Sequence, residues 1–138
     1  MQSLFEFSKQ NNVKYFMISF TDLFGGQRAK LVPAAAISEM QNNGAGFAGF
    51  ATWLDMTPAH PDMLAIPDPT SVVQLPWKPE VAWVAANCVM EDQLVEQAPR
   101  NVLQKQIASA AKWAFALKLE LKPSSFCLIP MAVRFLMS

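Results

Sequence analysis

The chain has 138 residues, of which 52% are hydrophobic and 16% are charged, and its eleven basic and eleven acidic residues cancel. This length fits one domain, or one domain plus a fragment. No basic stripe runs along the sequence, which argues against nucleic acid as a partner. An average soluble domain carries about 25% charged residues. The composition therefore predicts an apolar face that a protein partner covers.

The sequence shows no targeting or membrane signal. Its first residues lack the basic-then-apolar layout of a signal peptide. The apolar run from Phe126 to Met137 is interrupted by Pro130 and Arg134, and it is shorter than the ~20 residues of a membrane helix. Cys88 and Cys127 have no metal-ligand spacing and are expected to be reduced thiols. We therefore expect a cytoplasmic protein that does not contact a membrane.

The N-terminal segment predicts a short helix followed by a β-hairpin. Residues 3–12 have a weak helical period, and apolar residues then alternate over 13–21, as in a strand. The Gly25–Gly26 pair marks a turn. Residues 27–32 alternate again, as in a half-buried strand.

A second helix and two further strands are expected next. Pro33 suits the first turn of a helix over 34–43, and Gly44 suits its C-terminal cap. Residues 72–75 are a short strand candidate. Residues 81–90 are almost continuously apolar, which is typical of a central strand covered on both faces.

A last helix is predicted from Pro99 to Lys118. Its apolar residues recur at helical spacing and predict a buried stripe, made of Leu103, Ile107, Ala110, Ala114 and Leu117. Before this helix, the order of elements is hairpin, helix, loop and strands. That order predicts a small α+β domain, a β-grasp-like sheet with one packed helix.

The segment from Gly44 to Ser71 has neither helical nor strand period over most of its length. Long irregular loops are functional or disordered, and disordered segments are poor in aromatic residues. This loop is rich in large apolar residues, so we expect it to be ordered and functional. Its candidate substrate-loop residues are Trp53, Asp55 and Asp62. The alternatives are that the aromatic residues anchor the loop by packing and that the aspartates form turns.

The remaining polar residues fit structural roles better than roles in catalysis or metal binding. His60 has no evident carboxylate partner and reads as a solvated loop residue. Arg28 and Lys30 fit an exposed strand face. Solvated positions are also expected for three acidic residues: Glu91, Asp92 and Glu96. We predict no catalytic residue, no cofactor-binding residue and no metal ligand in this chain.

Three ordered motifs carry a family resemblance: TDLFGGQRAKLVPAAAI at 21–37, GAGFAGFATWLDMTPAHPDMLAIPDPTSV at 44–72, and VMEDQLVEQAPRNVLQKQ at 89–106. Together they resemble the amino-terminal β-grasp domain of glutamine synthetases. The resemblance is closest to type III GlnT-like enzymes and γ-glutamylmethylamide synthetases. It implies a β-grasp domain over 1–97 and the first helix of a catalytic domain over 98–118.

The resemblance implies an ATP-dependent ligase that joins glutamate to ammonia or a small amine through a γ-glutamyl phosphate. In such enzymes Mg or Mn ions held by glutamates in a large carboxy-terminal domain neutralise the phosphates. That domain is absent from this chain, so the fragment is expected to be inactive by itself. The small domain is expected to supply the Gly44–Ser71 loop to a neighbouring subunit's active site in a ring-shaped homo-oligomer.

The sequence departs from the common family pattern at one position that concerns the amine substrate. The common family pattern Phe-Asp-Gly-Ser-Ser places an ammonium-binding aspartate in this loop, and Ala48 stands at that position here. An ungapped match places Asp62 on a family aspartate and Asp68 on the aspartate of a Pro-Asp pair. It also places a family tryptophan on Asp55, with Trp53 two residues earlier. Because alanine cannot bind a cation through charge, the resemblance suggests an alkylamine substrate.

The resemblance ends after Lys118, where the family continues with a Glu-x-Glu-Phe-Phe strand. Shifting the reading frame by one base at that codon recovers this pattern, so residues 119–138 are expected to be an out-of-frame tail. An alternative to a truncated ligase is a free-standing β-grasp interaction module whose sheet edge recruits a partner strand.

Overall fold

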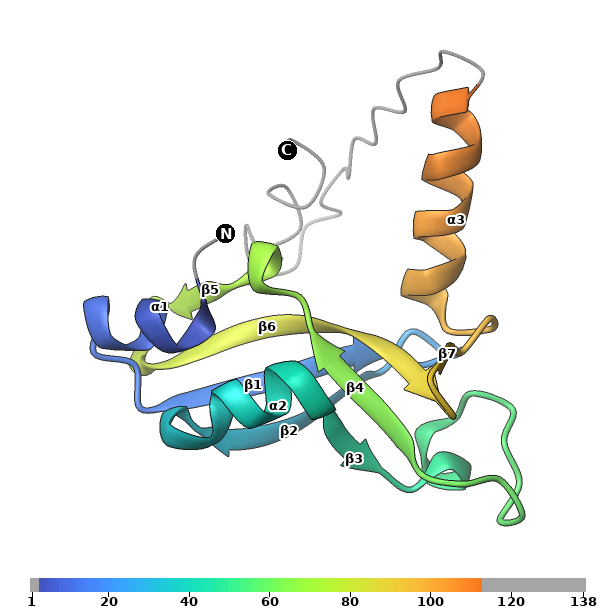
Figure 1. Ribbon diagram of the computed structural model, residues 1–138, viewed down its shortest axis with the longest axis horizontal. Coiled ribbons are helices and arrows are strands. Elements are labelled where there is room, and N and C mark those ends of the chain that lie inside the picture. The colour runs from blue at the N-terminus through green and yellow to red at the C-terminus, as the bar shows by residue number, and fades with distance from the viewer. Residues whose placement is uncertain (1–2, 113–138) are drawn as a thin grey trace.

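The computed structural model describes residues 3–112 of the chain (Figure 1). Ala114, Leu117 and the tail over 119–138 lie outside the described residues, and so do the predictions made for them. The helices are α1 (Leu4–Gln10), α2 (Ile37–Asn43) and α3 (Pro99–Lys112). The strands are β1 (Tyr15–Thr21), β2 (Gln27–Pro33), β3 (Ala45–Phe47), β4 (Met63–Pro67), β5 (Val73–Leu75), β6 (Lys78–Met90) and β7 (Gln93–Leu94).

The strands of the described residues form one mixed sheet in the order β2-β1-β6-β4-β3, and β5 and β7 both pair with β6. β1 and β2 form the predicted antiparallel hairpin, with Tyr15 opposite Pro33 and Thr21 opposite Gln27. β1 then runs parallel to β6 at the centre of the sheet. This α+β architecture of β-grasp type confirms the predicted fold class (Figure 1).

The core lies between the sheet and helices α1 and α2. Phe16, Ile18 and Phe20 alternate along β1 and are all buried, because strand side chains point to opposite faces in turn. Leu4 of α1 and Ile37 of α2 pack into this core, and neither side chain has exposed surface. Each such side chain contributes about 1.5–3 kcal/mol when it leaves water. Two short helices therefore cover the sheet, where one was predicted.

The segment from Gly44 to Ser71 contains two strands that its sequence did not reveal, β3 and β4. β4 lies between β3 and β6 in the sheet and pairs antiparallel with both. Met63 and Ala65 are buried and alternate with half-buried neighbours. The strand has only five residues and ends at Pro67, so turn-forming prolines hide its period. The irregular part of the segment is therefore shorter than predicted.

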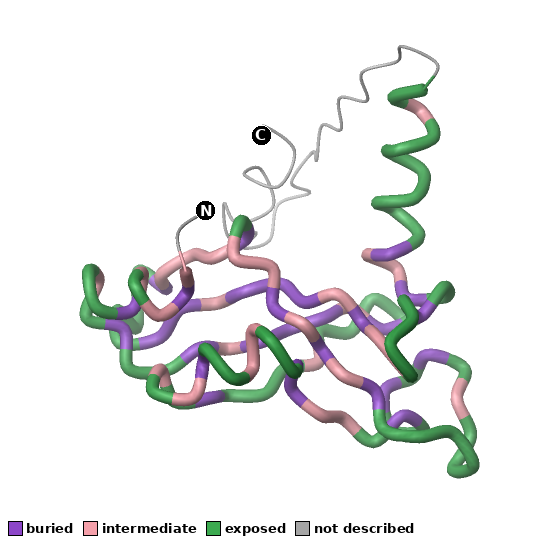
Figure 2. Tube along the Cα trace, viewed as in Figure 1, coloured by how far each residue is buried: buried purple, intermediate pink, exposed green. Residues whose placement is uncertain are grey.

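The predicted buried stripe of α3 is wrong at Leu103 and Ile107. Leu103 is 44% exposed and Ile107 is 37% exposed, and Asn101 is the buried residue of the helix. Ala110 is half-buried. The helix contacts the sheet near its first turn and then stands away from it (Figure 2). The apolar period is present, but the described part of the chain leaves Leu103 and Ile107 exposed.

Within residues 3–112, no helix is long and apolar enough to cross a membrane.

Candidate functional site

The β1–β2 hairpin turn contacts the tip of the Gly44–Ser71 loop. The backbone N–H of Leu23 donates to the carbonyl of Trp53 at 3.2 Å. The rings of Phe24 and Trp53 meet edge to face, with centroids 5.6 Å apart. The Arg28 guanidinium lies 5.9 Å from the Trp53 ring centroid, within the range of a cation–π contact. Residues distant in sequence thus hold one aromatic side chain.

A buried carboxylate organises the hairpin side of this contact. Asp22 accepts hydrogen bonds from the N–H groups of Gly26 at 2.7 Å and Phe24 at 3.0 Å. It also accepts one from Nε of Arg28 at 2.9 Å. Burial raises the pKa of Asp22, but these donors and the positive charge of Arg28 outweigh it and hold the pKa below its ordinary value of 3.8. The ionised carboxylate fixes Arg28 beside Trp53.

Sequence reasoning missed this role of Asp22. The available signal was an aspartate directly before a glycine-containing turn, since aspartate side chains bond the backbone of such turns. The prediction that Arg28 and Lys30 lie on an exposed strand face is also incomplete. Arg28 pairs with Asp22, and Lys30 donates to the carbonyl of Gly46 and lies 5.0 Å over the Phe47 ring. Both cations therefore tie β2 to neighbouring segments.

The backbone at the loop tip is left-handed at two residues that are not glycine. Trp53 has φ of 55° and Asp55 has φ of 59°. Between them, the Leu54 side chain is fully buried in the core. A bulky residue in this conformation costs about 1–3 kcal/mol, and such strain gathers at functional sites. The tip therefore presents Trp53, which is 55% exposed, on a strained but anchored backbone.

The rest of the loop is held by its own hydrogen bonds. Thr52 Oγ1 donates to the Gly49 carbonyl at 2.6 Å, and the Thr57 N–H donates to His60 Nδ1 at 2.9 Å. At Gly49, an added Cβ would come within 2.8 Å of the Pro61 carbonyl oxygen. His60 is exposed and has Thr57 as its partner, as expected for a structural loop residue.

The structure separates the three predicted substrate-loop residues. Trp53 and Asp55 share the loop tip, and Asp62 is exposed just before β4. Within residues 3–112, Asp62 makes no hydrogen bond or ion pair with either. The packing interpretation fits Phe47, whose ring meets Phe20 edge to face at 5.0 Å. It does not fit Phe50, which is 57% exposed.

The interpretation of an aspartate as a turn former is confirmed at Asp68. Its Oδ1 accepts from the N–H of Thr70 at 3.0 Å and caps the 3-10 turn at Pro69–Ser71. Its other oxygen accepts from Arg100 of α3 at 2.5 Å.

No metal centre is found among residues 3–112, where no three His, Cys, Asp or Glu side chains gather closely enough to hold an ion. Glu91, Asp92 and Glu96 are exposed, as expected for a solvated connection. Burial raises the pKa of the Cys88 thiol to about 12. This cysteine is therefore a neutral core residue and not a nucleophile.

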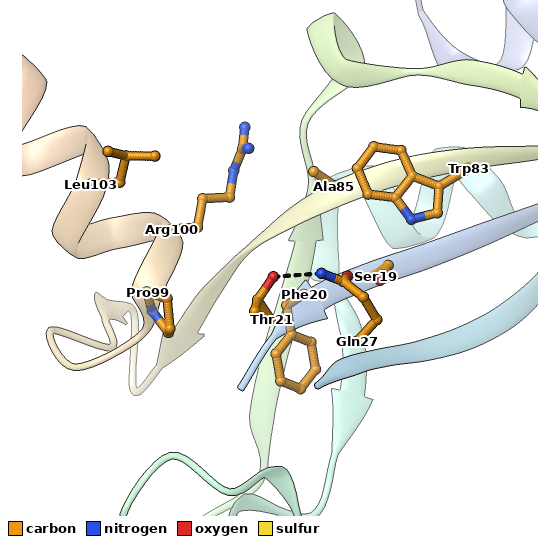
Figure 3. A pocket seen from close by; sticks show the side chains of 9 residues that line it. All are labelled: Ser19, Phe20, Thr21, Gln27, Trp83, Ala85, Pro99, Arg100 and Leu103. Atoms are coloured by element: carbon orange, nitrogen blue, oxygen red, sulfur yellow. Dashed lines mark hydrogen bonds between the residues drawn. The ribbon is translucent and has the colours of Figure 1, made fainter. Parts of the chain in front are cut away.

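A cavity of about 260 Å³ lies between the sheet and the first turn of α3 (Figure 3). Ser19 donates to Gln27 at 2.9 Å, and Gln27 donates to Thr21 at 2.8 Å. These polar groups satisfy one another, and Trp83 and Leu103 supply apolar walls. The arrangement offers no nucleophile or base, so the loop tip remains the candidate functional site.

Comparisons with known proteins point to one group of ligases. No family model matches the chain. It is 65% identical over 120 residues to a glutamine synthetase of Rhizobium leguminosarum bv. phaseoli, covering 87% of this chain and 28% of that protein. It is 36% identical over 119 residues to a glutamate–methylamine ligase of Methyloversatilis universalis, covering 83% of this chain and 27% of that protein.

A solved structure has the same fold. A GmaS–ADP complex superposes with a TM-score of 0.80 and is 55% identical, covering 82% of this chain and 26% of the GmaS chain. The present chain thus spans slightly more than a quarter of the length of the proteins it matches.

Proposed function

The chain belongs to the glutamine synthetase family as an amino-terminal part, and we propose that it is the β-grasp portion of a ligase joining glutamate to ammonia or a small amine. The observation that carries this proposal is the ordered loop tip, in which Trp53 and Asp55 are exposed on a left-handed backbone. The hairpin turn and the buried Leu54 hold that tip in place. Such a rigid projection suits insertion into a neighbouring subunit's active site.

The reacting groups would lie outside this chain. ATP and Mg or Mn are implied for the complete enzyme, and residues 3–112 offer no cluster that fits a metal. No catalytic step is therefore assigned to these side chains. The proposed role of Trp53, Asp55 and Asp62 is to line the neighbour's substrate pocket, and the chain alone is expected to be inactive.

The proposed domain boundary lies between β7 and α3. Residues 1–97 would form the β-grasp domain, and the helix from residue 98 would be the first element of the catalytic part. The support is that β7 ends at Leu94, and that α3 begins at Pro99 and stands away from the sheet. Its exposed apolar residues, Leu103 and Ile107, would be covered in the complete enzyme.

The proposed assembly is a ring-shaped homo-oligomer in the cytoplasm, without nucleic acid or membrane partners. Subunit partners are favoured because four large apolar residues are exposed around the loop tip and the hairpin turn, namely Leu23, Phe24, Phe50 and Trp53. In a ring, each subunit can present the same tip to the next subunit.

The proposed amine is an alkylamine. Ala48 is exposed at the position where an ammonium-binding aspartate is common in the family. Its methyl group offers no charge to a cation and leaves space for a carbon substituent. The curated relatives include a protein named for methylamine as well as proteins named for glutamine.

A chimera tests this proposal. Residues 1–118 of this chain would replace the matched segment of the R. leguminosarum relative, and turnover of glutamate and ATP would be measured with methylamine and with ammonia. The chimera is expected to be active and to use methylamine with the higher kcat/KM. Ala48→Asp should raise the ammonia-to-methylamine ratio about tenfold, because a hydrogen bond to a charged group contributes ~1.5–3 kcal/mol.

Ala51→Asp is the matched control, since Ala51 is also exposed in the loop. It should leave the ratio unchanged. An assembled chimera that is inactive with both amines would contradict the proposed function. An active chimera that strongly prefers ammonia would contradict the alkylamine assignment alone.

A further inference from the structure

The segment that opens α3 contacts the functional loop at two distant points. Gln97 Nε2 donates to the carbonyl of Leu54 at 2.9 Å, beside the loop tip. Three residues later, Arg100 donates to Asp68 at 2.5 Å, where the loop ends. Figure 3 shows Arg100 in the first turn of α3, where it lines the cavity. One short segment thus contacts both the loop tip and the turn that follows β4.

This segment is itself fixed to the central strand. Asn101 is 93% buried, and its Nδ2 donates to the carbonyls of Cys88 at 3.1 Å and Val95 at 2.8 Å. Arg100 Nε also donates to Asn87 Oδ1 at 2.9 Å. The start of α3 therefore has a set position over β6.

Two consecutive carbonyls at the loop tip are held by different parts of the chain. The Trp53 carbonyl accepts from Leu23 of the hairpin turn, and the Leu54 carbonyl accepts from Gln97. These two hydrogen bonds hold the left-handed backbone between the hairpin turn and the segment before α3. Because that conformation is strained, it persists only when its surroundings determine it.

We propose that Gln97 is a positioning residue that couples the start of α3 to the backbone of the loop tip. The inference rests on the proposed function, in which the tip completes an active site. It adds that the tip depends on the helix leading into the rest of the enzyme. Gln97 acts through the Leu54 carbonyl and so sets how Trp53 and Asp55 are presented.

Amide hydrogen exchange of the 138-residue chain tests the coupling directly. Gln97→Met keeps the length of the side chain and removes its donor. Exchange of the Leu23 amide, which is bonded to the Trp53 carbonyl, should become about fivefold faster, the factor expected from losing one hydrogen bond. The Val84 amide in β6 should not change. Gln106→Met, on the exposed face of α3, is the matched control and should leave both rates unchanged.

The chimera provides a second readout. Gln97→Met should raise KM for the amine about fivefold and leave KM for ATP unchanged. Gln97→Lys keeps a donor of similar reach, so its KM for the amine should stay close to that of the unsubstituted chimera. An unchanged Leu23 exchange rate, or an equal rise in both KM values, would overturn the coupling. An inactive chimera with faster Leu23 exchange would instead refute the proposed function and leave the coupling standing.

Discussion

Replacing Gly44 with alanine is expected to destabilise the fold by about 3 kcal/mol, the sum of backbone strain and a steric clash. Gly44 ends α2 with φ of 79° and ψ of 163°, a region that is essentially restricted to glycine. An added Cβ would lie 2.8 Å from Ile66 Cδ1 and 2.9 Å from Leu64 Cβ, closer than such atoms approach. Urea unfolding followed by circular dichroism measures the loss.

Gly46→Ala is the control for this substitution. Gly46 lies two residues further on in β3, lacks a positive φ, and has no atom within 4 Å of the position of an added Cβ. The same chemical change should therefore have little effect there. If the two variants were equally stable, the account of Gly44 as an obligatory glycine would be wrong.

Replacing Leu54 with alanine is expected to cost about 2–5 kcal/mol, the range for truncating a buried leucine. Its side chain is fully buried and lies between two left-handed residues. Losing it removes the anchor that holds the tip against the core. The free energy of unfolding should fall, and activity of the chimera should fall with it because Trp53 and Asp55 would no longer be presented.

Leu23→Ala makes the same truncation on the other side of the contact. Leu23 is 48% exposed, so its removal should cost well under half as much as that of Leu54. Comparing the two unfolding midpoints separates core anchoring from general loss of apolar surface. A larger loss at Leu23 would contradict the assigned role of Leu54.

The elements predicted well are those with local causes. The hairpin follows from alternating apolar residues around Gly25–Gly26, and Gly44 does end the second helix as expected. α3 begins at Pro99, where the sequence indicates a helix start. In each case a few adjacent residues determine the backbone, so their types are sufficient for the prediction.

The features missed depend on contacts between distant segments. β4 becomes a strand because β3 and β6 lie on both sides of it, and its own five residues carry too little pattern. The contact of Asp22, Arg28 and Trp53 needs the hairpin turn to meet the loop tip. The stripe of α3 has a helical period, but a period does not show whether a partner covers it.

The assignment of a functional site to the Gly44–Ser71 loop stays a prediction. The sequence pointed to this segment because aromatic residues are unusual in an irregular loop, and the structure places Trp53 and Asp55 together at its tip. Their left-handed conformation could not be predicted, since it is imposed by the buried Leu54 and by bonds from Leu23 and Gln97. Aspartate adopts this conformation more often than most residues, but a bulky residue such as Trp53 rarely does.

The central claim is that the loop acts in a neighbouring subunit, and mixing two inactive chimeras tests it most directly. One chimera would carry Trp53→Ala and Asp55→Ala with an intact catalytic part. The other would keep the loop and lose a catalytic glutamate expected to hold metal. Co-expressed, they should regain about a quarter of full activity, because a random ring pairs an intact loop with an intact catalytic part at that frequency. If the mixed oligomer assembles and stays as inactive as its two parents, the loop does not act between subunits.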